Sequence, residues 1–287
     1  EPQARSCVPL RSLQDDRMTL PYMDPAWYAS DGPLQTRIDT HRRYSRLQEP
    51  WADWLLSLVT IDPRAAVLDA GCGAGAILLP AARLAPLGRV VGIDQSHPML
   101  DRCRADARDA RLRVHLARGD VQRLPFANAC FDLVMMNHML YHVPDIPAAL
   151  AEAWRTLRPG GVLLAATNSV DNMPQLAAIL HRTWASAGLG EPPSGESLAR
   201  RFGLENGGTL VGAAFGNVTR HNRRDALVFP TPDPLLAYAA SMAPLREIPA
   251  AARTSVFAAI RREIEAVIDA EGQFVVDKLS GAFVAHR

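Results

Sequence analysis

Short apolar runs alternate with longer helical runs between residues 65 and 168, and this alternation constrains the fold more than any other feature of the chain. Such alternation is typical of successive β-α-β units, whose strands align as a parallel sheet between layers of helices. The five predicted strands cover residues 65–70, 88–94, 112–120, 131–137 and 160–168. Alanine-rich segments with apolar residues at helical spacing lie between them. The sequence therefore predicts an α/β fold built on a doubly wound sheet.

The chain after residue 170 follows a less regular pattern. We expect a helix near 172–187, a sixth strand within 215–230, helices within 231–242 and 249–272, and a strand or hairpin at 273–287. Two helices between the last two strands indicate an insertion at the sheet edge where ligands of open α/β sheets usually bind. We place this helical insertion at about 232–270, inside a domain that spans residues 61–287.

The first 60 residues are unusually aromatic. Aromatic side chains supply binding surface as well as core, so residues 1–60 are predicted to form an N-terminal cap or lid. A helical layer packed on the sheet is the alternative. The region holds three of the five tryptophans and three of the five tyrosines: Trp27, Trp51, Trp54, Tyr22, Tyr28 and Tyr44.

The composition is that of an ordinary globular protein, with 48% hydrophobic and 21% charged residues. The formal net charge is +1, and arginines interleave with aspartates, which argues against a nucleic-acid partner. No apolar run reaches the roughly 18 to 20 residues of a membrane span, and the first residues lack the apolar core of a signal peptide. We expect a cytoplasmic protein without membrane or nucleic-acid partners, present as a monomer or homodimer.

The cysteines show no C-x-x-C spacing, so neither a zinc site nor a dithiol redox site is indicated. All four are therefore predicted to be free thiols: Cys7, Cys72, Cys103 and Cys130.

The stretch DAGCGAGA, residues 69–76, follows the first predicted strand. Its glycines let the backbone turn tightly and approach a ligand closely. The spacing fits two loops. One is the G-x-G-x-x-A loop of dinucleotide binding, and the other is the D-x-G-x-G-x-G loop that binds S-adenosyl-L-methionine. The glycines alone do not distinguish the two cofactors.

Two carboxylates beside this loop narrow the choice. Asp94 ends the second predicted strand, where the ribose hydroxyls of either cofactor would lie. Asp69 stands two residues before Gly71, where its charge would repel a pyrophosphate and attract the ammonium of a methionyl group. Asp69 therefore favours S-adenosyl-L-methionine, which carries no phosphate.

Two later segments add nucleoside-binding features. In GDVQRLPF, residues 119–126, Asp120 could accept a hydrogen bond from an adenine amino group, with Val121 and Leu124 as apolar surface. The strand FDLVMMN then brings Asn137 to the carboxyl edge of the central sheet.

Four segments in this order and spacing resemble the class I S-adenosyl-L-methionine-dependent methyltransferases. They are VLDAGCGAG, VVGIDQS, ARGDVQRLPFANACFDLVMMNHMLYHVPD and LRPGGVLLAATN, and they cover residues 65–168. The sequence is most similar to the branch that includes ubiquinone/menaquinone-biosynthesis and natural-product small-molecule methyltransferases. The resemblance implies a Rossmann-like methyltransferase fold with a mostly parallel seven-stranded sheet, and S-adenosyl-L-methionine as the cofactor.

The resemblance also assigns cofactor contacts to particular residues. The loop residues would surround the methionyl and adenosyl parts, with Cys72 as a small side chain that fits the turn. Asp94 would hold the ribose, Gln95 and Met99 would lie beside the adenine, and Asp120 would lie at its edge with Val121. The assigned set is Asp69, Gly71, Cys72, Gly73, Gly75, Asp94, Gln95, Met99, Asp120, Val121, Asn137 and His138.

Methyl transfer from a sulfonium requires alignment and exclusion of water, and a base only where the acceptor starts protonated. The candidate bases are His138, Tyr141 and His142 after the fourth strand, and His41 in the N-terminal region. His142 has a structural alternative, because the HVPD segment can shape the turn and let Asp145 cap the next helix. His138 and His142 stand four residues apart, but a loop is expected there, so no metal site is predicted.

The main hypothesis is transfer of a methyl group to O, N or C of a small-molecule metabolite in bacterial secondary metabolism. A protein of this fold that uses S-adenosyl-L-methionine only for binding or for another reaction is the first alternative. The second is an NAD(P)-dependent oxidoreductase, which would need a hydride-site pair such as Tyr/Lys, yet the only lysine is Lys278.

Overall fold

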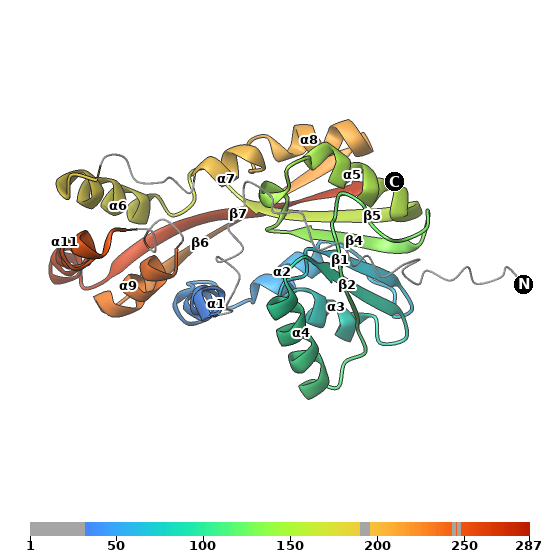
Figure 1. Ribbon diagram of the computed structural model, residues 1–287, viewed down its shortest axis with the longest axis horizontal. Coiled ribbons are helices and arrows are strands. Elements are labelled where there is room, and N and C mark those ends of the chain that lie inside the picture. Colours follow the sequence, from blue (N-terminus) through green and yellow to red (C-terminus); the bar gives the residue numbers. More distant parts are fainter. Residues whose placement is uncertain (1–31, 190–195, 243–244, 246–247) are drawn as a thin grey trace, which may run out of the picture.

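The computed structural model describes residues 32–189, 196–242, 245 and 248–287. Their strands form a seven-stranded sheet in the order β3-β2-β1-β4-β5-β7-β6 (Figure 1). Neighbouring strands among β1 to β5 are parallel, whereas β7 runs antiparallel to both β5 and β6. The predicted doubly wound, mostly parallel seven-stranded sheet is confirmed. The strands are β1 Ala66–Ala70, β2 Arg89–Asp94, β3 His115–Arg118, β4 Phe131–Asn137, β5 Leu157–Asn168, β6 Val218–Phe229 and β7 Phe274–His286.

Helices cover both faces of the sheet, as expected when helical crossovers link parallel strands. In Figure 1, α2, α3 and α4 lie below the sheet, and α5 and α8 lie above it. The short helices η2 and α7 contact each other near α5. These helices are α2 Trp51–Ser57, α3 Leu78–Leu84, α4 His97–Asp109, η2 Leu140–His142, α5 Ile146–Thr156, α7 Glu196–Arg201 and α8 Gly207–Phe215.

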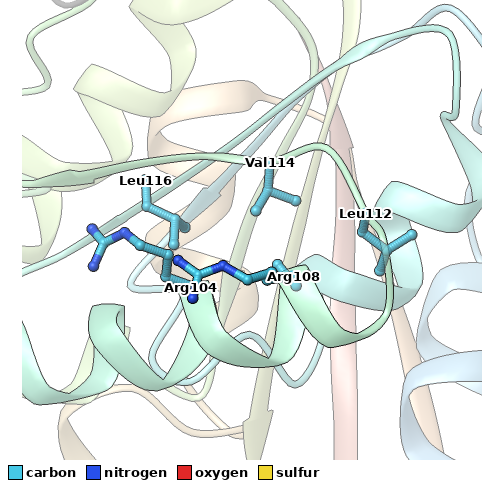
Figure 2. Close-up of a pocket in the computed structure, with 6 residues that line it drawn as sticks. Arg104, Arg108, Leu112, Val114 and Leu116 are labelled. Carbon is cyan, nitrogen blue, oxygen red and sulfur yellow. The ribbon is translucent and has the colours of Figure 1, made fainter.

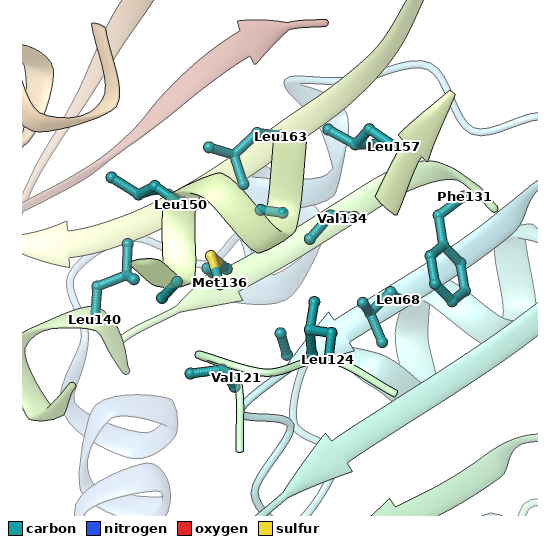
Figure 3. Close-up of a cluster of buried hydrophobic side chains, with 14 of the residues drawn as sticks. Leu68, Val121, Leu124, Phe131, Val134, Met136, Leu140, Leu150, Leu157 and Leu163 are labelled. Atoms are coloured by element: carbon teal, nitrogen blue, oxygen red, sulfur yellow. The ribbon is translucent and has the colours of Figure 1, made fainter. Parts of the chain in front are cut away.

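A hydrophobic cluster fills each face of the sheet. Leu68 of β1, Met136 of β4 and Leu163 of β5 pack toward α5 in the cluster that Figure 3 shows. The residues that alternate with them on the same strands, such as Val67 and Met135, pack on the opposite side against α2 and α3. This alternation follows from the two-residue period of a strand, and burial on both sides explains why β1 and β4 read as continuous apolar runs.

The strands β6 and β7 pair along their whole length and extend beyond the rest of the sheet. β5 pairs only with residues 280–286 of β7, so residues 274–279 continue past Asn168 with β6 alone. Four helices pack around this extension (Figure 1). We call the extended ribbon and these helices the ribbon lobe. The helices are α1 Gly32–Tyr44, α6 Pro174–Ser186, α9 Pro232–Ser241 and α11 Ala250–Glu271.

The lobe has its own apolar core, which includes Phe229, Tyr238 and Val276. The helices α9 and α11 stand between β6 and β7 in the chain, as predicted for residues 231–272. The division into a cap at 1–60 and a domain at 61–287 stays a prediction. Trp27, Tyr22 and Tyr28 lie outside the described residues.

Two predicted strand limits differ from the structure. The third strand is shorter than the predicted 112–120, because β3 is an edge strand that pairs only with residues 91–94 of β2. The fifth strand begins three residues before the predicted 160, since Leu157 already pairs with Phe131 across an irregularity in the register. Both differences arise from pairing with a neighbouring strand, and the local sequence pattern does not indicate how far such pairing extends.

The prediction of four free thiols is wrong at Cys130, which is disulfide-bonded. Cys72 and Cys103 are free and buried, as predicted. Cys7 lies outside the described residues. The two thiols are held in apolar surroundings next to the glycine-rich loop, and burial raises the pKa of both.

Within the described parts of the chain, no helix has both the length and the apolar character needed to cross a bilayer. The longest of these helices is α11, with 22 residues, and it carries charged side chains along its length.

Candidate functional site

The glycine-rich loop joins β1 to α3 at the carboxyl edge of the sheet. Gly71, Gly73 and Gly75 have φ angles of +82°, +52° and +89°, a region that side chains disfavour. The amides of Gly71 and Cys72 both donate to the carbonyl of Ile93, at 2.7 and 3.1 Å. The loop is therefore tied to the end of β2.

The three glycines meet different surroundings. A Cβ on Gly71 would lie 2.8 Å from Met139 Cγ, and one on Gly75 would lie 2.6 Å from Cys103 Sγ. A Cβ on Gly73 would meet nothing within 4 Å among the described residues. Gly71 and Gly75 are therefore required by packing against the protein, whereas Gly73 presents bare backbone to open space.

Two carboxylates flank this open space. Asp94 ends β2, where its Oδ2 accepts from the Gly73 amide at 2.8 Å and its Oδ1 from the Ser96 amide at 2.8 Å. Asp69 on β1 is only 2% exposed. Burial, followed by the charge of Asp94, raises the pKa of Asp69 to about 7, against a partly compensating hydrogen bond from the Leu78 amide. Burial also raises the pKa of Asp94.

The predicted adenine-side residues divide into exposed, buried and hydrogen-bonded groups. Gln95 is exposed, whereas the Met99 side chain is almost fully buried. Asp120 accepts hydrogen bonds from the amide and side chain of Gln122, at 2.9 and 3.0 Å. The Val121 side chain lies inside the cluster under α5 (Figure 3). The cofactor contacts assigned to these residues stay predictions.

Asn137 ends β4, next to the loop in the sheet order. Its Oδ1 and Nδ2 are both buried, and neither has a hydrogen-bond partner within the described parts of the chain. A buried amide with four unused hydrogen-bonding positions costs free energy unless a ligand or water satisfies it. Asn137 is therefore the polar group at this edge that most clearly lacks a partner.

His138 follows Asn137 with a φ of +52°, so its side chain leaves the strand direction. Its ring lies 5.3 Å from the Trp51 ring at the start of α2. Burial, with a smaller contribution from the charge of Lys278, lowers the pKa of His138 to about 4. The imidazole is therefore neutral at pH 7 and carries a lone pair that can accept a proton or hydrogen bond.

Tyr141 and His142 lie in η2 and contact each other, with ring centroids 4.6 Å apart. Arg201 donates to the carbonyl of Tyr141 at 3.0 Å and holds this turn against α7. Asp145 caps α5 by accepting from the Ala148 amide at 2.9 Å, as the structural alternative predicted. Burial lowers the pKa of His142 to about 4. The turn is thus fixed by these contacts whether or not His142 has a chemical role.

His41 reaches the site from α1. Its Nε2 lies 3.4 Å from the Tyr238 hydroxyl, and that hydroxyl donates to Met173 Sδ at 3.3 Å. Burial, then the charges of Lys278 and His138, lower the pKa of His41 to about 3.

Sequence reasoning missed two charged residues in this region, Lys278 of β7 and Asp225 of β6, which are paired in the sheet register and form an ion pair of 3.3 Å. A signal was present, because Lys278 is the single lysine of the chain. What could not be read from the sequence is that this strand runs past the end of β5 beside β6.

A cavity of about 310 Å³ lies elsewhere, between α4 and the edge strand β3 (Figure 2). Its lining includes Arg104, Arg108 and Leu116, and none of the residues predicted for the site. No group of three or more potential metal ligands occurs among the described residues.

Residues 68–165 match the family model described as Methyltransferase domain. The chain is 32% identical to malonyl-[acyl-carrier protein] O-methyltransferase of Enterobacter lignolyticus, over 58% of this chain and 61% of that protein. It is 42% identical to nocamycin O-methyltransferase of Saccharothrix syringae, over 39% of this chain and 41% of that protein. The chain thus spans less than two thirds of the length of these relatives.

The fold is shared with a solved structure of a putative methyltransferase from Bacillus halodurans. The TM-score is 0.57 at 17% identity, and the match covers 82% of this chain and 98% of that one. At this identity the likeness concerns the fold alone. Together with the family match, it confirms the resemblance expected from the segments between 65 and 168.

Proposed function

We propose that this protein, whose residues 68–165 form a methyltransferase domain, transfers a methyl group from S-adenosyl-L-methionine to an oxygen of a small-molecule acceptor. One observation carries the proposal: the open backbone at Gly73 is bordered by two carboxylates, the buried Asp69 and the half-buried Asp94, and faces an edge with an amide unpartnered among the described residues. The names of both relatives, each an O-methyltransferase, support oxygen as the acceptor atom. A place in bacterial secondary metabolism stays a prediction.

The residues present fit this cofactor better than a dinucleotide. Buried carboxylates at Asp69 and Asp94 leave uncompensated negative charge beside the loop, which a cationic ligand relieves and a pyrophosphate would worsen. The Asn137 amide can both donate and accept, so it matches a ligand group that carries a carboxylate and an ammonium. Asp94 also has free lone pairs beyond its two amide contacts, which suit ribose hydroxyls.

When bound, S-adenosyl-L-methionine supplies a methyl carbon on a positive sulfur, so an acceptor lone pair forms the new bond while the C–S electron pair returns to sulfur. The chain's own part is to hold the acceptor in line and to exclude water. Trp51, whose ring lies tilted against that of His138 at the start of α2, offers an apolar wall on that side. A protonated acceptor would in addition need a group that takes its proton.

Two neutral imidazoles can take that proton, His138 and His41. For His41 the tautomer follows from its contacts. The Tyr238 hydroxyl donates to Met173 Sδ, so its oxygen accepts from His41 Nε2–H, and the lone pair is on Nδ1. Nδ1 is buried without a partner among the described residues. We assign His138 and His41 as the candidate bases, with Tyr141 and His142 as parts of the supporting turn.

Calorimetric titration with S-adenosyl-L-methionine and, separately, with NAD tests the cofactor. We expect saturable binding of the first and none of the second. Release of S-adenosylhomocysteine is then measured with a panel of hydroxyl, carboxyl and amine acceptors. Binding of NAD without S-adenosyl-L-methionine would overturn the proposal, and cofactor binding without turnover of any acceptor would favour a binding role.

The variants His138→Gln and His41→Gln test the base. Loss of a general base lowers kcat by about 10²- to 10⁴-fold for a protonated acceptor while the cofactor Kd stays unchanged. His97→Gln is the matched control, because His97 is exposed at the start of α4. Unchanged kcat in both site variants would show that alignment alone drives transfer.

A further inference from the structure

Lys278 is a buried cation on the acceptor side of the site. It is the single lysine of the chain, and its side chain is 14% exposed. Its Nζ lies 3.3 Å from Asp225 Oδ2, and that carboxylate is only 6% exposed. A charged ammonium is costly to bury unless its hydrogen-bonding capacity is used.

Asp225 does not use up that capacity, because its own oxygens already have other partners. Oδ2 accepts from the Ser45 hydroxyl at 2.6 Å, and Oδ1 accepts from the amides of Leu47 and Ala226 at 3.2 and 2.7 Å. The ammonium has three protons, and one contact of 3.3 Å uses one of them. Two remain without an acceptor within the described parts of the chain.

The register places Lys278 just beyond the carboxyl edge of the parallel strands. Ser280 pairs with Asn168, the last residue of β5. Lys278 stands two residues before Ser280 in the antiparallel β7, and therefore beyond the end of β5. Side chains of every second residue share a face, so Lys278 lies on the side of Ala282, which packs in the α2–α3 cluster. Trp51 packs against the same cluster.

The charge of Lys278 affects the pKa of two imidazoles on other elements. Lys278 is the second cause, after burial, of the lowered pKa of both His138 and His41. His138 follows β4 and His41 belongs to α1, and the chain just after α1 reaches the pair directly, since the Ser45 hydroxyl donates to Asp225.

The other charged groups of this region are already engaged. Arg223 donates to the carbonyls of Glu49 and Pro50 and pairs with the Glu49 carboxylate. Arg37 donates to the carbonyl of Ser241 at 2.8 Å. The imidazoles are neutral, so Lys278 is the cation of this region with N–H groups that lack an acceptor among the described residues.

We propose that Lys278 binds an anionic oxygen of the methyl acceptor, the oxygen of a carboxylate or of an ionised enol or phenol. This inference rests on the proposed function and narrows its substrate class. The acceptor oxygen would accept hydrogen bonds from the two remaining ammonium N–H groups. The third N–H group donates to Asp225, which holds Nζ in place. The cofactor side, with Asp69 and Asp94, would by contrast repel such an anion, so the acceptor can enter in one orientation only.

The single lysine allows a direct test, because protein labelled with [ζ-¹⁵N]lysine gives one lysine side-chain signal. Protein loaded with S-adenosylhomocysteine is titrated with acetate and benzoate, and with acetamide and benzamide as neutral counterparts. We expect a saturable shift of the Nζ signal with the carboxylates, with a Kd on the order of 1 to 10 mM, and none with the amides. No saturable shift up to about 100 mM, or equal shifts with acids and amides, would overturn the inference.

Variants separate binding from a structural role of the Lys278–Asp225 pair. By calorimetry, Lys278→Gln is expected to weaken benzoate binding by at least about tenfold, and Lys278→Arg, which keeps the charge, by less than about threefold. Arg224→Gln is the matched control, because Arg224 is exposed on the neighbouring strand. If Lys278→Gln loses only thermal stability and keeps its benzoate affinity, the lysine is structural and the inference is wrong.

The same measurements distinguish failure of the inference from failure of the proposed function. Absence of cofactor binding in the wild type, with benzoate still bound in a Lys278-dependent way, would sink the methyltransferase proposal alone. Cofactor binding and turnover of neutral acceptors only, with no effect of Lys278→Gln on the acceptor KM, would sink the acceptor assignment alone.

Discussion

The two sides of the candidate site hold different ionisable groups: carboxylic acids on one, an imidazole and an ammonium on the other. On the side of β1 and β2, burial raises the pKa of Asp69 and Asp94. On the side of the ribbon lobe, burial lowers the pKa of His41 and Lys278. In both places, groups that are removed from water lack a full set of hydrogen-bond partners, which costs free energy. Under the two proposals above, a cationic ligand group would relieve the first side and an anionic acceptor oxygen the second.

The two sides are also built differently. The cofactor side is made by short segments, since Gly73 and Asp94 are 21 residues apart and joined by a hydrogen bond of 2.8 Å. The ribbon side joins Ser45 to Asp225 across 180 residues. The following predictions test the contrast, from the largest expected effect to the smallest.

Asp69→Asn removes the buried negative charge and keeps the shape of the side chain. We expect the Kd for S-adenosyl-L-methionine to rise about 100-fold, because the ammonium loses its partner in a water-poor site. Calorimetry measures this affinity. The benzoate affinity on the ribbon side should stay within about twofold, since the two sides act independently. Asp109→Asn, at the exposed end of α4, is the control. An unchanged Kd in Asp69→Asn would refute the cationic character of this side.

Gly73→Ala fills the open space beside the loop. A methyl group there would weaken cofactor binding by about 30-fold, because backbone and ligand could no longer approach closely. Gly272→Ala is the matched control, since Gly272 also has a positive φ, +79°, and also faces open space at the end of α11. Both variants should lose about 1 kcal/mol of unfolding free energy. If both also bind the cofactor equally well, Gly73 does not border the ligand.

The pH dependence of cofactor binding follows from the pKa of Asp69, about 7 in the folded protein. The ionised carboxylate binds the ammonium, so affinity should rise about tenfold between pH 6 and pH 8. Stability without ligand has the opposite sign. A folded pKa above the ordinary 3.8 favours the protonated form, so this contribution is present below about pH 4 and lost as the pH rises through 7. Calorimetry and urea unfolding measure the two trends, and both should vanish in Asp69→Asn.

Asn137→Ala removes the buried amide that lacks partners. Cofactor affinity should fall about fivefold, whereas thermal stability without ligand should stay the same or rise, because an unsatisfied polar group is deleted. The measurement is thermal unfolding with and without S-adenosylhomocysteine. A clear loss of stability in the ligand-free variant would mean that the amide has a structural role instead.

Much of the cofactor side could be predicted because its signals are local. The strand pattern located β1 and β2, and the glycine spacing together with Asp69 and Asp94 described one loop and its two flanking acids. Less could be predicted where a side chain's surroundings come from packing. The burial of the Val121 side chain in the cluster under α5 and the disulfide at Cys130 are examples.

The sequence by itself determined the five parallel strands with the helices between them, the glycine-rich loop and the acids beside it, because these depend on periodicity and on residues close together in the chain. Only the tertiary structure decided what faces the loop. The β6–β7 ribbon returns antiparallel beside β5 and carries Lys278 past the sheet edge, where α1 adds His41. Strand pairing between distant segments has no local signature, so the charge opposite the cofactor side emerged only from the folded chain.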